Sequence, residues 1–146
     1  MPKYNTNLAS EFYVLSMLHR LGVDAALTLG NKKAVDIIIA NEDKTIITVE
    51  VKGLVKAYDW PADNIHQFSD TQHFYVLVSF EGKIEDPHAL PSVWVIPANK
   101  LEPFIRKYKT RIVISRSMMT NQGKQYLHNW SLIIGKNTIT NTGKSK

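Results

Sequence analysis

The chain of 146 residues contains no cysteine, so disulfide bonds and thiolate metal sites are excluded. It also lacks an apolar run approaching the roughly 18–20 residues of a membrane-spanning helix. Its N-terminal stretch, MPKYNTNLASEF, lacks the apolar core of a signal peptide. From these absences we expect a cytoplasmic protein with no membrane partner.

Acidic residues are almost missing from the last third of the chain. Residues 100–146 hold 10 Lys and Arg but one acid, which gives a net charge of +9, whereas residues 1–99 hold 8 basic and 12 acidic residues, which gives −4. A basic segment on a mildly acidic body fits a polyanionic partner such as nucleic acid. It fits equally a solvated surface with a basic tail.

Hydrophobic periodicity predicts a mixture of helices and strands. A first helix is expected from about Asn7 to Leu21, with Gly22 as its C′ residue. Glu11 falls in the middle of the apolar arc of this helix. The arc consists of Val14, Leu18, Leu15, Leu8 and Phe12.

The remaining pattern favours a sheet with helices. Strands are predicted at residues 25–29, 34–40, 45–52, 74–80 and 93–96, with a short helix at 64–68. A further helix is predicted after an N-cap at Asn99, and late strands at residues 111–115 and 130–134. The sequence therefore predicts one α/β domain over residues 1–134, with a mixed sheet flanked by helices, and a disordered basic tail over 135–146.

The stretch VDIIIANEDKTIITVEVKG, residues 35–53, places three charges inside apolar strands. Charged side chains are rarely buried unless they are paired or bind a metal. Glu50 and Lys52 share one face of their strand because side chains alternate. A three-residue loop would place Asp36 opposite Glu50 on that face, and a two-residue loop would place it on the other. We predict the first register.

Two facing carboxylates suit Mg²⁺, which takes oxygen ligands and keeps several waters, and we expect Mn²⁺ to substitute for it. The Val51 carbonyl is a further candidate ligand, and Glu11 could serve the same ion or a second one. Lys52 could orient or help deprotonate an attacking water, or balance the charge of a phosphate. A structural ion pair without metal is the open alternative, and the helix dipole alone could account for Glu11.

The order Asp36, then Glu50-Val51-Lys52, resembles the signature of the PD-(D/E)XK nuclease superfamily, an acid on the second core strand followed by acid-x-Lys on the third. Glu11 matches the helix glutamate of many branches, whereas Val35 stands where the signature has proline. The resemblance spans roughly residues 7–96 and is nearest in size to archaeal-type Holliday junction resolvases. It implies a restriction-endonuclease-like αβββαβ core, metal-dependent hydrolysis of DNA, and Asp36, Glu50 and Lys52 as the catalytic set.

The resemblance also implies partners. Small nucleases of this kind usually cut duplex DNA as dimers, so a homodimer is expected. The residues predicted to contact nucleic acid are Lys32, Lys33, His66, Gln67, Arg111 and Arg116. The alternative function is a catalytically silent module that keeps the nuclease fold to bind DNA or a protein partner.

Overall fold

A computed structural model of the chain describes residues 4–28, 35–65 and 71–140. The first helix, α1 (Thr6–Arg20), is capped by the side chain of Asn5, which accepts a hydrogen bond from the Leu8 N–H. Gly22 follows the helix with a φ of +86°, the left-handed conformation expected for a C′ glycine. The predicted first helix and its end are confirmed.

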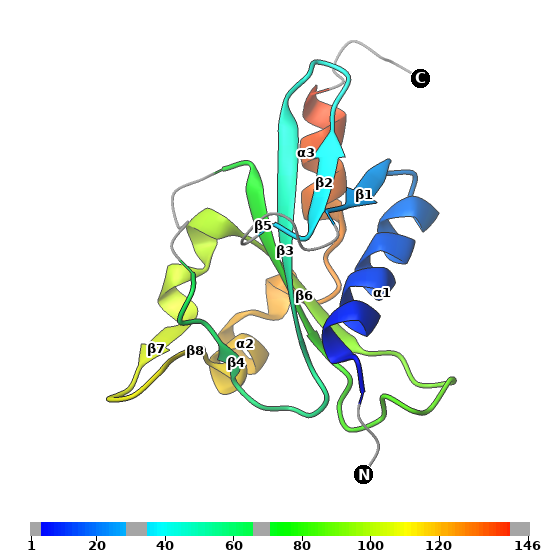
Figure 1. Cartoon of the computed structure of the whole chain (residues 1–146). Coiled ribbons are helices and arrows are strands. Elements are labelled where there is room, and N and C mark those ends of the chain that lie inside the picture. Colours follow the sequence, from blue (N-terminus) through cyan, green and yellow to red (C-terminus); the bar gives the residue numbers. More distant parts are fainter. Residues whose placement is uncertain (1–3, 29–34, 66–70, 141–146) are drawn as a thin grey trace.

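The main sheet is mixed and has five strands, in the spatial order β1-β2-β3-β5-β6 (Figure 1). β3 and β5 are parallel, and the other neighbouring pairs are antiparallel. The strands are β1 (Ala25–Leu27), β2 (Ile37–Ala40), β3 (Ile46–Leu54), β5 (His73–Ser79) and β6 (Ser92–Pro97). The predicted α/β class with a mixed sheet flanked by helices is therefore confirmed.

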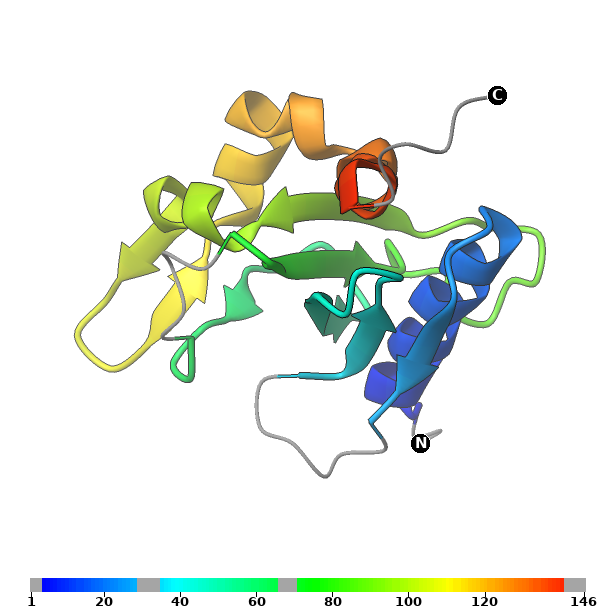
Figure 2. The same cartoon turned by 90° about the horizontal axis from the view of Figure 1, so that it is seen from above.

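A second, smaller sheet follows the order β4-β8-β7 and is antiparallel. Its strands are β4 (Trp60–Pro61), β7 (Ile105–Lys107) and β8 (Ile112–Ile114). The remaining elements are α2 (Arg116–Gln122), α3 (Ser131–Thr140) and three 3₁₀ helices, η1 (Ala98–Lys100), η2 (Glu102–Phe104) and η3 (Lys124–Tyr126). Figure 2 shows α1 and α3 near one end of the molecule and β7, β8 and α2 near the other.

Two apolar cores are built on the main sheet. One joins the sheet to Val14 of α1 and Ile133 of α3. The other joins the sheet to Trp60 of β4 and Met119 of α2. All seven residues of β5 are buried, as expected for a strand that is covered on both faces. Leu8 and Phe12, which were predicted to pack inward from α1, are instead 42% and 51% exposed.

The helix predicted after Asn99 is wrong. The chain makes η1 and η2 and then turns into β7, with Ile105 extended at φ −81° and ψ 136°. Pro103 explains the difference, because a proline removes one helical hydrogen bond and clashes with the carbonyl four residues earlier. The apolar spacing of this segment is that of a helix, but Pro103 within the segment prevents the helix from forming.

Two further boundaries are corrected. Residues 130–134 were predicted as a strand, but α3 begins at Ser131 and continues to Thr140, so residues 135–140 are helical and 141–146 lie outside the described residues. Short apolar runs do not separate strand from helix by periodicity alone. A helix was also predicted at residues 64–68. Asn64 lies in a turn with Asp63 and Ile65 is not helical, and residues 66–68 lie outside the described residues.

No helix within the described residues has the length and apolar character needed to cross a bilayer.

Candidate active site

The hairpin of β2 and β3 has the predicted register. Ile37 is opposite Val49, Ile39 is opposite Ile47, and the Asn41 N–H donates to the Thr45 carbonyl at 2.9 Å across the loop. This register brings Asp36 and Glu50 to the same end of the hairpin. The three-residue loop predicted from the sequence is confirmed.

Asp36 ends the pairing of β2 with β3. Its N–H donates to the Val49 carbonyl at 2.8 Å, and its carboxylate Oδ2 accepts the Val51 N–H at 2.7 Å. A side chain thus occupies the position where another strand residue would continue the ladder. Among the described residues, the paired register of β2 with β3 does not continue beyond Ile37 and Val49.

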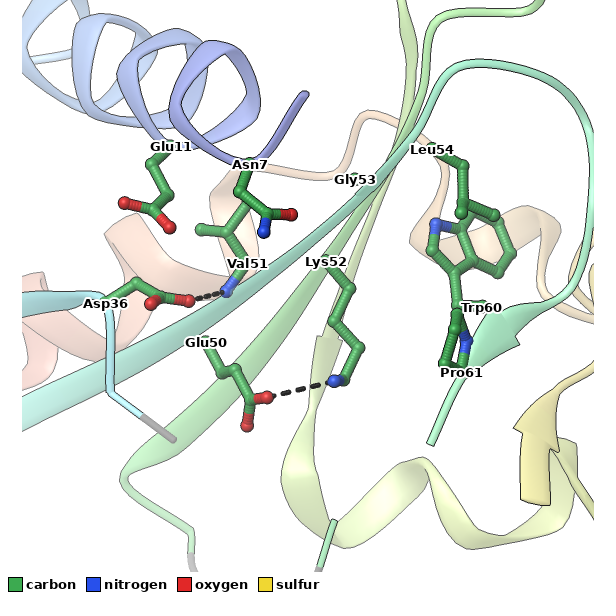
Figure 3. Close-up of a pocket in the computed structure, with 10 residues that line it drawn as sticks. All are labelled: Asn7, Glu11, Asp36, Glu50, Val51, Lys52, Gly53, Leu54, Trp60 and Pro61. Atoms are coloured by element: carbon green, nitrogen blue, oxygen red, sulfur yellow. Dashed lines mark hydrogen bonds and ion pairs between the residues drawn. The ribbon is translucent and has the colours of Figure 1, made fainter. Parts of the chain in front are cut away.

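A cavity of about 300 Å³ lies beside Asp36 and β3 (Figure 3). It brings together residues from α1, from β3, from β4 and from Asp36, which directly precedes β2. Its lining consists of Asn7, Glu11, Asp36, Glu50, Val51, Lys52, Gly53, Leu54, Trp60 and Pro61. The four residues predicted to be catalytic therefore share one cavity with the Val51 backbone.

Glu50 is 8% exposed, and its charged partner among the described residues is Lys52. Its Oε2 lies 3.0 Å from the Lys52 Nζ, as Figure 3 shows. Its Oε1 is buried and has no hydrogen-bond partner within the described part of the chain. A buried carboxylate oxygen without a partner is unfavourable, and binding a cation would satisfy it.

Burial raises the pKa of Asp36, against the lowering effects of the Val51 N–H and the Lys52 charge. Burial also raises the pKa of Glu11, and the nearby negative charge of Asp36 raises it further. Both carboxyl groups are therefore harder to ionise here than in water. A cation placed between Asp36 and Glu50 would reverse that trend for the groups that bind it.

Glu11 approaches the cavity from the other side of β3. Alternation places Glu50 and Lys52 on the face opposite Val51, while Val51 packs in the same apolar core as Val14 of α1. Within residues 4–28, 35–65 and 71–140, no group of three or more His, Cys, Asp or Glu side chains is placed to hold a metal ion. Carboxylates and a backbone carbonyl are oxygen ligands of the kind that Mg²⁺ takes together with waters.

No family model matches the chain, and no curated protein matches it. The fold is similar to that of a bacterial homing endonuclease. The solved structure of I-Ssp6803I aligns over 99% of this chain and 100% of its own length, with a TM-score of 0.57 and 15% sequence identity. At that identity the likeness shows a nuclease-like fold.

The residues predicted to contact nucleic acid have different surroundings within this nuclease-like fold. Lys32, Lys33, His66 and Gln67 lie outside the described residues. Arg111 is exposed, and its guanidinium carbon lies 5.9 Å from the centre of the Tyr108 ring.

Arg116, which is also predicted to contact nucleic acid, makes several intramolecular contacts. Its Nη2 lies 2.9 Å from Glu81 Oε2, and its guanidinium carbon lies 4.8 Å from the ring centre of Trp94. Its backbone N–H donates to Asp59 at 2.8 Å. The guanidinium therefore ties α2 to the loop after β5.

Sequence reasoning missed part of the cavity wall. Asn7 lies one helical turn before Glu11, so the i, i+4 spacing was a usable signal. Trp60 is fully buried, with its indole N–H donating to the Val78 carbonyl at 3.1 Å, and it lines the cavity together with Pro61. No local signal indicates this wall, because β4 has two residues and forms by pairing with the distant β8.

Proposed function

We propose that this protein is a metal-dependent endonuclease of the PD-(D/E)XK type that hydrolyses DNA phosphodiester bonds. The observation that carries the proposal is the gathering of Asp36, Glu50 and Lys52 in one cavity, at the point where Asp36 ends the pairing of β2 with β3. The nuclease-like fold supports it.

Asp36 and Glu50 would hold Mg²⁺ or Mn²⁺, with the Val51 carbonyl as a further oxygen ligand. The unpartnered Oε1 of Glu50 supports this assignment. A bound ion of this kind supplies Lewis-acid stabilisation of the charge that develops on a phosphate, and it lowers the pKa of water.

The other residues of the cavity act on the substrate and its surroundings. In phosphodiester hydrolysis a water oxygen bonds to phosphorus and the bond from phosphorus to the leaving oxygen breaks. The water gives up a proton to solvent or a nearby base, and the leaving oxygen takes one up to become a hydroxyl. Lys52 orients that water or balances the phosphate charge. Glu11 supports the site from α1, on the opposite side of β3.

Duplex or branched DNA is the proposed substrate, and a homodimer is the proposed assembly. Cutting both strands of a duplex needs two active sites or two successive events, and each chain has one such cavity among its described residues. Sedimentation of the protein with and without a short duplex would measure the assembly.

The test is cleavage of plasmid, linear duplex and four-way junction in Mg²⁺ or Mn²⁺. We expect the parent to nick or cut, and Asp36→Asn and Lys52→Ala each to lose at least about 100-fold in rate, since both remove a group from the reacting centre. Lys56→Ala is the matched control, because Lys56 is exposed and does not line this cavity. Equal rates for Lys52→Ala and Lys56→Ala would refute the assignment.

The Glu50–Lys52 ion pair supports a second candidate, a catalytically silent module in which these charges serve architecture alone. Titration calorimetry with Mg²⁺ separates the two. The nuclease predicts a binding isotherm for the parent that Asp36→Asn abolishes. A parent that binds DNA but takes up no Mg²⁺ or Mn²⁺ favours the silent module.

A further inference from the structure

The hairpin of β7 and β8 carries the densest positive charge in the described part of the chain. Four of the six residues in Arg106–Arg111 are basic, and all six are exposed. Figures 1 and 2 show the hairpin extending from the body at the end away from α1. Its exposure and its charge make it a candidate surface for a partner.

Within the described residues, no ion pair neutralises the cations of the hairpin. The ion pairs there are Lys52–Glu50 and Arg116–Glu81, and neither involves the hairpin. The sequence also has no acidic residue after Glu102. Close like charges repel one another, so this surface is suited to a polyanion.

The register of the hairpin sorts its side chains onto two faces. Arg106 pairs with Val113, and the Tyr108 N–H donates to the Arg111 carbonyl at 2.8 Å around a two-residue turn. Alternation therefore places Arg106, Tyr108 and Arg111 on one face. Ile105 and Ile112 lie on the other and pack against the second apolar core. The face away from that core presents two guanidinium groups and a tyrosine that is 55% exposed.

The same sheet joins the hairpin to the candidate active site. β4 pairs Trp60 with Ile114 and Pro61 with Val113 of β8, and both β4 residues line the cavity. The Asp63 carboxylate also accepts the Ile112 N–H at 2.9 Å. A ligand bound along the hairpin is therefore held at a fixed position relative to the cavity.

We propose that the β7–β8 hairpin is a DNA-binding arm whose tip enters the major groove of a duplex and holds the backbone against the cavity. The inference rests on the proposed function, because it takes DNA as the ligand. The major groove admits a two-stranded β-ribbon, and arginine is the side chain most often paired with guanine O6 and N7. Lysine at the turn fits the phosphates that flank the groove.

Fluorescence anisotropy with a labelled duplex in EDTA tests the arm without cleavage. The triple variant Arg106→Gln, Lys109→Gln, Arg111→Gln is expected to bind roughly 10- to 100-fold more weakly than the parent. The slope of log Kobs against log salt should flatten by about 0.9 for each phosphate that the variant no longer neutralises. The control removes three exposed lysines elsewhere, Lys83→Gln, Lys100→Gln and Lys124→Gln, with the same change in net charge.

Dimethyl sulfate footprinting tests the groove, because this reagent methylates guanine N7 on the major-groove side. The parent should protect guanines within its site, and the triple variant should not. If anisotropy shows that the duplex binds but no guanine N7 is protected, the proposed entry of the hairpin into the major groove is refuted. Circular dichroism melts that coincide with the parent establish that the exposed substitutions leave the fold intact.

The remaining outcomes separate the arm from the nuclease. If the parent binds and cuts duplex DNA while the triple and control variants lose affinity equally, the arm is refuted and the proposed function stands. If Asp36→Asn stops cleavage without losing affinity, and the triple variant loses affinity, both proposals are supported. A parent that neither binds nor cuts DNA overturns both.

Discussion

Asp36 makes a structural hydrogen bond, but burying its charge is unfavourable. Its carboxylate accepts the Val51 N–H at 2.7 Å and thereby ends the β2–β3 ladder. Burial nevertheless raises its pKa, so the ionised form is less favourable in the folded chain than in water. A residue whose charge opposes folding is typical of a functional site.

Asp36→Asn should therefore stabilise the metal-free protein at neutral pH. With a raised folded pKa, the folded state binds more protons than the unfolded state, and parent stability falls as pH rises through that pKa. Asparagine cannot ionise, and its Oδ1 can still accept the Val51 N–H. The gain should stay below about 1 kcal/mol because the carboxyl is only partly buried.

Thermal melts in EDTA between acid and neutral pH measure this effect. The advantage of Asp36→Asn should be largest at neutral pH and should vanish below the ordinary pKa of an aspartate. A variant less stable than the parent at neutral pH would mean that the Lys52 attraction outweighs burial.

Among the described residues, Lys52 is the only cation that lines the cavity, and it faces a nearly buried Glu50. Lys52→Met should lower the free energy of unfolding by about 1–3 kcal/mol, since it leaves that carboxylate without its charged partner. Added Mg²⁺ should restore part of the stability, because the ion replaces the missing positive charge.

Thermal melts with and without Mg²⁺ check this prediction, with Lys56→Met as the exposed control. A structural ion pair with no metal site predicts the same destabilisation but no recovery in Mg²⁺. The size of the recovery is thus a readout of metal binding that does not depend on activity.

At the scale of elements, local patterns predicted the hairpin but not the opposite wall of the cavity. The strands of residues 35–53 follow from alternating β-branched residues, and the charged loop fixes their register. β4 forms through contacts with residues about fifty positions away, including Asp63 to Ile112 and Asp59 to Arg116. No short window of the sequence contains both partners, so this wall of the cavity could not be predicted.

The helix predicted after Asn99 and the strand predicted at residues 130–134 were wrong for local reasons. Pro103 interrupts an otherwise helical spacing, and the run at 130–134 is compatible with either strand or helix. The contacts of Arg116 with Glu81 and Trp94 could not be foreseen because both partners are distant in the sequence, and its contact with nucleic acid stays a prediction. Basic residues can be assigned to a ligand only once the acids beside them are known.

Gly53 sets the distance between β3 and α1. A Cβ built there would lie 1.8 Å from the Ser10 Oγ and 2.7 Å from the Ser10 Cβ. Gly53→Ala should therefore push α1 away, lower the free energy of unfolding by about 1–3 kcal/mol, and displace Glu11 from the cavity. Chemical denaturation measures the change in stability.

Two variants control this prediction. At Gly135, in α3, an added Cβ meets no atom within 4 Å, so Gly135→Ala should be neutral or stabilise by up to about 1 kcal/mol. The pair Ser10→Gly with Gly53→Ala removes the clash and should recover part of the stability. If the pair is merely additive, the Ser10 contact is not the cause.

At the scale of the whole molecule, charge of opposite sign is separated between two connected sites. The cavity gathers three carboxylates and one lysine, whereas the β7–β8 hairpin carries four unpaired cations within the described residues. Arg116 belongs to neither, because Glu81 neutralises it. A DNA backbone is thus attracted by one end of the small sheet and repelled at the other unless a cation occupies the cavity.

This separation predicts that removing a cavity charge strengthens DNA binding when no metal is present. Asp36→Asn in EDTA should bind a duplex several-fold more tightly than the parent, because one carboxylate no longer faces the phosphates that the hairpin brings to the cavity. Asp24→Asn makes the same change in net charge at an exposed position that does not line the cavity, and should leave the affinity nearly unchanged. Anisotropy titrations of both variants at two salt concentrations decide the matter. An equal gain in both would assign the effect to net charge, and no gain in either would mean that the bound backbone does not reach the cavity.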